Sequence, residues 1–262
     1  MFVLLHQIRD LVILILLIVA SIQDIKTREI DDRIWMIAAI VTVPVLVLDL
    51  ISSPYLTKVI ATVFGLLLSL AIYLAQIMGG ADAKALAILA LVLPENIPKT
   101  MEISYILLTC LEATPVVVLI NAVLVTAITL IPYVVLRNVV WIFKRRRTFA
   151  PNADVFTKAM LFLTSYYVPV SKYLSEHFKY FLVELPAEEK KRYLLSIRIE
   201  DQDKLAEEVK QALERGLLGR DDEVLVMYGV PMIVYITIGY VLYRFLGIHI
   251  AFSILNFLSE IL

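Results

Sequence analysis

The chain has 262 residues, of which 60% are hydrophobic and 19% are charged, and its mean hydropathy is +0.84. A soluble domain carries about a quarter charged residues, so this composition argues against an ordinary soluble globular protein. The formal net charge of −1 gives no electrostatic basis for binding nucleic acid, and the single cysteine, Cys110, excludes an internal disulfide and a multi-cysteine zinc site.

Six apolar stretches follow one another along the chain, and each is a candidate membrane span because a span needs roughly 20 mostly apolar residues. They are Leu4–Gln23, Ile34–Leu50, Tyr55–Met78, Ala83–Leu93, Ala113–Phe143 and Val224–Leu246. The first contains Arg9 and Asp10, which we expect near the outer membrane interface. The sequence therefore predicts an all-α polytopic membrane protein with about six transmembrane helices.

The fourth stretch is too short for a simple crossing. Its 11 residues form about 16 Å of helix, roughly half of the ~30 Å hydrocarbon thickness. Either Asp82, just before it, lies below the membrane surface, or Ile103–Cys110 completes the crossing after a break at Pro94 and Pro98. The sequence does not choose between these alternatives.

Charged residues are concentrated between Lys144 and Glu223, which hold 15 of the 24 Lys and Arg and 14 of the 25 Asp and Glu. We therefore expect a membrane domain at 1–147, a small α+β cytoplasmic insertion at 148–223, and a final transmembrane helix with a tail at 224–262. Within the insertion, Tyr193–Ile199 has strand-like alternation in its second half. Asp201–Arg215 has the apolar spacing of an amphipathic helix.

Basic residues predict the orientation, because cytoplasmic loops of membrane proteins are enriched in Lys and Arg. Lys26, Arg28 and Arg33 follow the first span, and the run 144–147 follows the fifth. With six spans, both segments face the cytoplasm and both chain ends face outward. We expect a multi-pass protein of the cytoplasmic membrane.

Common catalytic and metal-binding motifs are missing from the sequence. The three histidines are isolated, so there is no His-Glu-x-x-His zinc motif, and neither a Gly-x-Ser-x-Gly nucleophile motif nor a phosphate-binding glycine loop occurs. We expect no metal and no cofactor.

Two carboxylates remain as candidates for chemistry. Asp24 ends the first span and Asp82 opens the fourth, 58 positions later, and the predicted topology brings both to the cytoplasmic side. Ionisable groups at such positions suggest function, and two carboxylates within a few ångströms share a proton. Such a pair supplies a base that activates water and an acid that protonates a leaving amine, as in aspartic proteases. Gly79 and Gly80 then allow unusual backbone conformations and a close approach of another chain.

Structural roles are alternatives for each of these residues. Asp82 is also a good helix N-cap, and Asp24 is also explained as a solvated charge paired with Lys26 or Arg28. Lys84 is either an interfacial side chain that reaches for the membrane surface or a group that tunes Asp82. The neighbouring acids Asp31 and Asp32 solvate a loop or attract a basic substrate segment.

The two aspartate segments together resemble the type IV prepilin peptidases, and especially their archaeal branch, the preflagellin peptidases. Asp24 through Ile30 fits the family's Asp-x-x-x-x-x-Ile motif. Gly79-Gly80-Ala81-Asp82 fits its second motif in the archaeal, hydrophobic form, and Lys84 matches a lysine common two positions later. The stretch from Gly229 to Tyr240 also looks like the family's last helix. Asp31 departs from the pattern, because many members have proline there.

This resemblance implies a membrane aspartic endopeptidase of the GxGD type. Asp24 and Asp82 would be catalytic, with Gly79, Gly80, Ala81 and Lys84 as supporting residues. The partners implied are the lipid bilayer and preflagellins or prepilin-like proteins, whose short basic leader is removed at the cytoplasmic membrane face. A presenilin-like intramembrane protease, an ion-coupled transporter and a non-catalytic scaffold are the alternatives. The sequence does not predict the oligomeric state.

Overall fold

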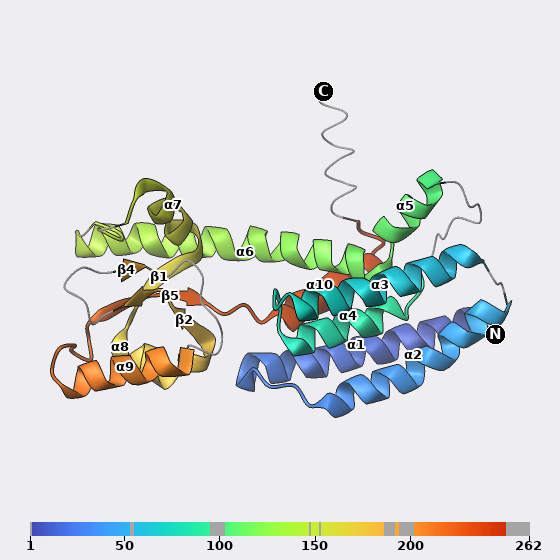
Figure 1. Cartoon of the computed structure of the whole chain (residues 1–262), viewed down its shortest axis with the longest axis horizontal. Helices are drawn as coiled ribbons and strands as arrows, with labels where there is room; N and C mark the ends of the chain where they lie inside the picture. Colours follow the sequence, from blue (N-terminus) through green and yellow to red (C-terminus); the bar gives the residue numbers. More distant parts are fainter. Residues whose placement is uncertain are drawn as a thin grey trace, which may run out of the picture. The chain divides into compact units, whose positions relative to one another are not determined.

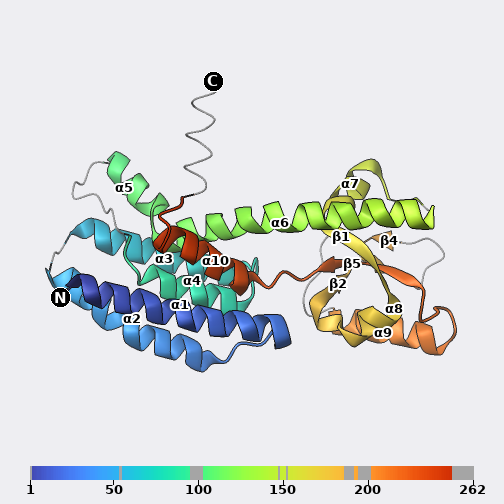
Figure 2. The same cartoon turned by 180° about the vertical axis from the view of Figure 1, so that it is seen from behind.

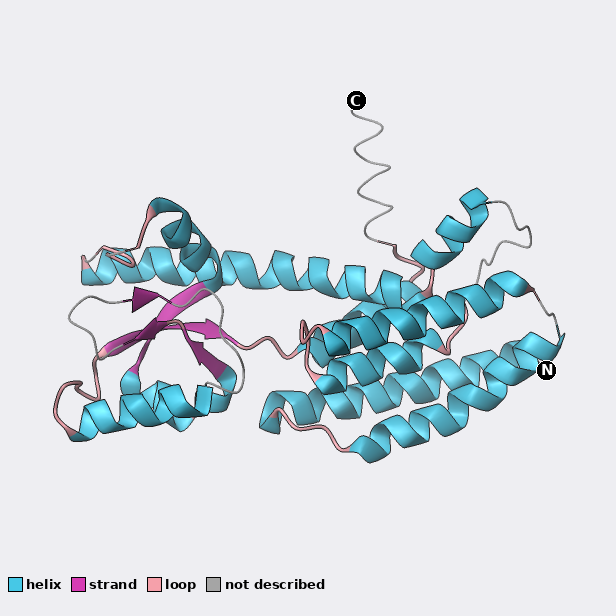
Figure 3. Cartoon of the chain, viewed as in Figure 1, coloured by secondary structure: helices cyan, strands magenta, loops and turns pink. Residues whose placement is uncertain are grey.

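A computed structural model describes residues 2–52, 55–94, 103–146, 148–151, 153–185, 192–193 and 202–249. Its helices and strands are shown in Figure 1 and coloured by type in Figure 3. The helices are α1 (Phe2–Thr27), α2 (Asp32–Ser52), α3 (Leu56–Leu74), α4 (Gly80–Ala90), α5 (Ile103–Leu111), α6 (Thr114–Arg145), α7 (Val155–Thr164), α8 (Val170–Ser175), the 3₁₀ turn η1 (His177–Lys179), α9 (Gln202–Glu214) and α10 (Met232–Arg244). The strands are β1 (Ser165–Pro169), β2 (Tyr180–Leu182), β3 (Glu184–Leu185), β4 (Arg192–Tyr193) and β5 (Glu223–Tyr228).

Four of the described helices, α1, α2, α3 and α6, are long and apolar enough to cross a membrane. Their surfaces carry exposed large apolar side chains such as Ile15, Ile40 and Leu67, which suits contact with lipid and not with water. The predicted polytopic membrane protein is therefore confirmed. The predicted count of six spans is not confirmed, because α4 and α10 have only 11 and 13 residues.

The chain forms two compact units, and the first contains residues up to Thr126 together with those from Pro231. Figure 2 shows these helices from behind, with α10 in red. α4 packs against α2, α3 and α10, and its residues Ala85, Leu86 and Leu89 are fully buried. The short helix is therefore enclosed by other helices. α5, which covers the alternative stretch Ile103–Cys110, packs against α3; the connection at 95–102 lies outside the described residues.

An ionic cluster of His6, Arg9, Asp10, Asp49 and Arg244 lies near the amino end of α1. Arg9 Nε lies 2.9 Å and Arg244 Nε 2.6 Å from Asp10 carboxylate oxygens, and His6 Nε2 lies 2.8 Å from Asp49 Oδ1. Arg9 is 1% exposed and Asp10 6% exposed. The two charges in the first apolar stretch are thus buried and paired within the helix bundle.

The second unit spans Ala127–Val230 and contains an antiparallel sheet with the strand order β1-β5-β2. One group of buried strand residues, including Val168 and Val226, packs with Leu205 and Val209 of α9. A second group, including Tyr167 and Leu225, packs with Phe149 and with Leu161 of α7. The predicted amphipathic helix at 201–215 is confirmed as α9. Most of the predicted strand at 193–199 lies outside the described residues, although Tyr193 belongs to β4.

The predicted helix over Val224–Leu246 is wrong in its first part. Residues 223–228 form the central strand β5, in which Val224, Leu225 and Val226 are 0–1% exposed. A strand buried on both faces reads as a continuous apolar run, which periodicity cannot distinguish from a buried helix. The helix begins only after Pro231, at Met232. The expected insertion at 148–223 lies inside the second unit. This unit also includes α6 from Ala127 onward and the whole of strand β5.

Candidate active site

Asp24 lies at the start of the last turn of α1 and is 8% exposed. Its Oδ2 accepts a hydrogen bond of 3.3 Å from the backbone N–H of Ile233, and its Oδ1 lies 3.6 Å from Arg28. Arg28 has a φ of 60°, a left-handed conformation that few residues other than glycine adopt. The predicted pairing with Arg28 is therefore present, but Asp24 is buried and not a solvated interfacial charge.

Asp24 is one end of a polar seam between α1 and α10. Ser21 Oγ donates to the carbonyl oxygen of Leu17 and lies 2.8 Å from Thr237 Oγ1, which itself lies 3.3 Å from the same carbonyl oxygen. The amino end of α10 carries a partial positive charge and unpaired N–H groups. The carboxylate of Asp24 therefore occupies the position of an N-cap acceptor for α10, supplied by another helix.

Asp82 is the third residue of α4 and is half-buried. Its Oδ2 accepts a hydrogen bond of 3.1 Å from the backbone N–H of Gly79, which is the N-cap residue. Asp82 therefore caps α4 from within the first turn, whereas the sequence had suggested that it is the N-cap itself. Its Oδ1 accepts no hydrogen bond from any residue in the described part of the chain. Capping thus uses one oxygen of Asp82 and leaves the other for a different partner.

Gly79 acts through its small size, and neither glycine before Asp82 has an unusual backbone conformation. Gly79 has φ −61° and ψ 155°, which any residue adopts, and the positive-φ glycines among the described residues lie elsewhere. A Cβ on Gly79 would lie 3.2 Å from Asp82 Oδ2, whereas a Cβ on Gly80 would meet only the ring of Tyr73, at 3.6 Å. The expected need for unusual backbone angles is therefore wrong, and Gly79 instead leaves room for the Asp82 carboxylate. Ala81, the third residue of the motif, packs against the apolar core.

Asp24 and Asp82 lie within electrostatic reach of each other. The charge on Asp24 acts on Asp82, and the guanidinium of Arg28 acts on both carboxylates. The two residues come from helices that do not follow each other in the chain, and α2 and α10 each pack against both helices. The fold therefore brings together the two carboxylates that the sequence singled out.

Lys84 points to a different acid. Its ammonium lies 2.5 Å from Asp32 Oδ1 at the start of α2, and both side chains are at least half exposed. The structure therefore pairs Lys84 with Asp32 and not with Asp82. No group of three or more potential metal ligands occurs among the described residues.

Two family models match this chain, one after the other. The model of the type IV leader peptidase family matches residues 11–131, a range that contains both Asp24 and Asp82. The model described as Archaeal Peptidase A24 C-terminus Type II matches residues 157–248. The chain belongs to the type IV leader peptidase family. The expected resemblance to the archaeal branch of these peptidases is confirmed, and no curated protein matches the chain.

The hydrogen bonds around Asp24 involve residues that the sequence did not single out. Ile233, Ser21 and Thr237 contribute a backbone N–H and two hydroxyls to the seam that holds Asp24. Ser21 and Thr237 are small polar residues inside apolar helices, which often mark helix–helix contacts in membranes. That signal was available, but the sequence does not show that these two positions face each other.

Proposed function

We propose that this leader peptidase is an aspartic endopeptidase whose catalytic pair is Asp24 and Asp82. It removes the short basic leader from preflagellins or type IV-like prepilins at the cytoplasmic face of the cell membrane. The observation that carries this proposal is the electrostatic interaction between two buried or half-buried carboxylates within the segment matched by the family model. A buried acid pair is costly for a fold, so its presence supports a chemical role.

The surroundings of the two carboxylates favour different protonation states. Asp24 has Arg28 and the amino end of α10 beside it, and both stabilise a negative charge. Asp82 accepts one backbone N–H, and its neighbour Lys84 is engaged with Asp32. In the pair that shares one proton, Asp24 is therefore the ionised base and Asp82 the proton-bearing acid.

The chemistry follows from these two states. Asp24 takes a proton from a water molecule, whose oxygen forms a bond to the scissile carbonyl carbon, while Asp82 gives its proton to the carbonyl oxygen. In the diol that results, the C–N bond breaks and the leaving nitrogen takes the proton held by Asp24. A diol hydroxyl returns a proton to Asp82 as the new carboxyl group forms. The pair ends in its starting state.

Charges near Asp24 support the substrate class and the orientation. Glu29 and Asp31 are exposed in the loop between α1 and α2, and these acids complement a leader rich in basic residues. Lys26 and Arg33 in the same region follow the charge bias of cytoplasmic segments. Both features favour cleavage of a basic leader at the cytoplasmic surface.

The experiment that tests this proposal maps the cut. Membranes containing the protein are incubated with an epitope-tagged preflagellin or prepilin, and the product termini are read by mass spectrometry. We expect one cut at the junction of the leader and the apolar segment, and none with Asp24→Asn or Asp82→Asn. A cut inside the apolar segment would favour a presenilin-like protease. Ion flux that depends on both aspartates, without any peptide product, would favour a transporter.

A further inference from the structure

The second unit carries an exposed apolar surface formed by α7 and one face of α6. On α7, Val155 is 88% exposed and Phe156 66% exposed, and on α6, Leu136 is 63% and Phe143 78% exposed. The opposite face of α6 packs on the sheet of this unit through Val134, which belongs to its buried core. Large apolar groups this exposed mark a contact surface.

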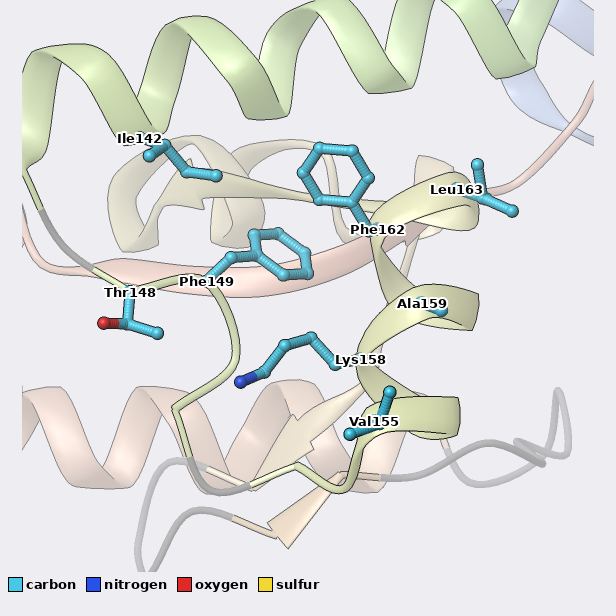
Figure 4. Close-up of a pocket in the computed structure, with 8 residues that line it drawn as sticks. All are labelled: Ile142, Thr148, Phe149, Val155, Lys158, Ala159, Phe162 and Leu163. Carbon is cyan, nitrogen blue, oxygen red and sulfur yellow. The ribbon is translucent and has the colours of Figure 1, made fainter.

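A pocket of about 600 Å³ opens in this surface between the end of α6 and α7. Figure 4 shows Ile142 of α6 on one side, Val155 and Ala159 of α7 on the other, and the rings of Phe149 and Phe162 between them. The two rings are 5.3 Å apart in an edge-to-face arrangement. The volume lies within the range of small-molecule sites, and such walls suit a hydrocarbon chain.

Lys158 is the one charged residue among those that line this mostly apolar pocket, and Thr148 is the other polar one. The side chain of Lys158 extends from α7 towards the segment that carries Phe149 (Figure 4). Lys158 forms no ion pair with any residue that the structure describes. An ammonium beside an apolar pocket suits a ligand with a hydrocarbon chain and a negative head.

The sequence that leads into the pocket is rich in basic residues. From Ala127 to Ala153 the chain contains five basic residues and no Asp or Glu, and the next acid, Asp154, caps α7. Three of the basic residues, Arg137, Lys144 and Arg145, line a neighbouring pocket with Glu223, to which Arg145 is paired. Basic residues next to exposed aromatic and aliphatic groups are typical of segments that bind anionic membrane surfaces. α6 is also one of the helices long and apolar enough to cross a membrane, which suits a lipid site on the same helix.

We propose that the pocket between α6 and α7 binds a hydrocarbon chain of an anionic membrane lipid, with the lipid phosphate beside Lys158. The site anchors the second unit to the membrane surface. It uses none of the residues assigned to peptide cleavage, so this proposal does not depend on the peptidase chemistry.

The test uses the full-length protein in nanodiscs of a neutral phospholipid. A small fraction of the lipid carries a photoreactive group in one hydrocarbon chain, on either an anionic or a neutral headgroup of otherwise identical structure. After irradiation, labelled peptides are quantified by mass spectrometry. We expect the anionic probe to label the segment 148–163 several-fold more than the neutral probe. Labelling of α1, α2 and α3 serves as the internal standard.

Two variants sharpen the test, each with a control on the exposed face of α9 in the same unit. Ala159→Trp fills the pocket and should abolish labelling at 148–163, whereas Gln211→Trp should not. Lys158→Gln should lower labelling by the anionic probe roughly fivefold, which is the effect of one basic residue at an anionic surface, whereas Lys210→Gln should not. Ala159 and Gln211 are both exposed, so neither tryptophan has to enter the core.

Three results would overturn the proposal. The first is labelling of 148–163 no stronger than that of α9, and the second is equal labelling by both probes in every variant. The third is labelling that is independent of headgroup and is displaced by an apolar substrate peptide, since the pocket would then hold peptide and not lipid.

Discussion

The helix pair α1 and α10 buries acidic side chains at both of its ends, but the two ends differ in how these acids are paired. At one end, Asp10 contacts Arg9 and Arg244, and Asp49 contacts His6. At the other end, Asp24 and Asp82 act on each other, and the described cation that acts on both is Arg28. One end matches its acids with bases, whereas the other has an excess of acid.

This difference separates structural acids from chemical ones. A buried carboxylate with well-placed counter-charges ties helices together, and removing one partner leaves an uncompensated charge. Where two neighbouring carboxylates share one counter-charge, neutralising one of them costs less folding stability, because their mutual repulsion disappears. The ionic cluster should therefore govern the stability of the first unit, and the Asp24–Asp82 end should govern its activity.

The largest effect on stability is expected from Asp10→Asn. This change leaves the buried Arg9 and Arg244 without their carboxylate, and we expect the free energy of unfolding to fall by about 3 kcal/mol. Thermal unfolding of the purified protein in detergent measures it. Asp24→Asn is the matched control on the same helix and should cost less than half as much. Equal losses at the two positions would contradict the distinction between the ends.

A smaller effect, on activity alone, is expected from Gly79→Ala. The new Cβ would lie 3.2 Å from Asp82 Oδ2 and push the carboxylate by a few tenths of an ångström. We expect the cleavage rate to fall about tenfold, because catalysis is sensitive to such displacements, while the unfolding temperature stays the same. Gly80→Ala is the control, since its Cβ has only ordinary contacts. The same rate for both variants would show that Gly79 does not position Asp82.

A still smaller effect is expected from Thr237→Val, which keeps the shape of the side chain but removes its hydrogen bonds to α1. Losing one such bond costs about 1 kcal/mol, and we expect cleavage to slow about threefold as Asp24 becomes less firmly held. Thr42→Val is the control, because buried Thr42 bonds only within α2. If both substitutions slow cleavage equally, the seam has no special role in holding Asp24.

The smallest effect is expected from Lys84→Gln. The Lys84–Asp32 pair is exposed, and exposed ion pairs contribute about 0–1 kcal/mol. We expect the cleavage rate to change less than twofold, measured with the same leader substrate and with Asp32→Asn alongside. A loss of tenfold or more would return Lys84 to a role in tuning Asp82.

The sequence predicted the candidate site better than the fold around it. Asp24 and Asp82 are recognisable because charged residues are rare at the ends of apolar helices, and each lies in a short motif. The contacts of Asp24 with Ile233 and of Ser21 with Thr237 span more than 200 positions, so no local pattern reveals them. The pairing of Lys84 with Asp32 depends on how the start of α2 packs beside α4, which the sequence does not reveal either.

The errors in the fold have a common physical cause. The length of an apolar stretch predicts a membrane helix only where its apolar side chains face lipid. In two segments of this chain the apolar side chains are instead buried against other parts of the protein. β5 is apolar because both of its faces are covered, and α4 is apolar although it is too short to cross a membrane. Burial within protein also explains why Arg9 and Asp10 are tolerated inside a long apolar helix. Arg9 lies beside Asp49 of α2, and Asp10 is paired with Arg244 of α10.

The most direct test of the central claim measures cleavage per folded molecule for Asp24→Asn, Asp82→Asn and Asp10→Asn. Each purified variant is scored for its folded fraction by thermal unfolding and for its initial rate of leader removal. We predict that Asp24→Asn and Asp82→Asn remain folded and lose cleavage, whereas the Asp10→Asn molecules that remain folded still cleave. Normal cleavage per folded molecule by either Asp24→Asn or Asp82→Asn would contradict the assignment of these two carboxylates as the catalytic pair.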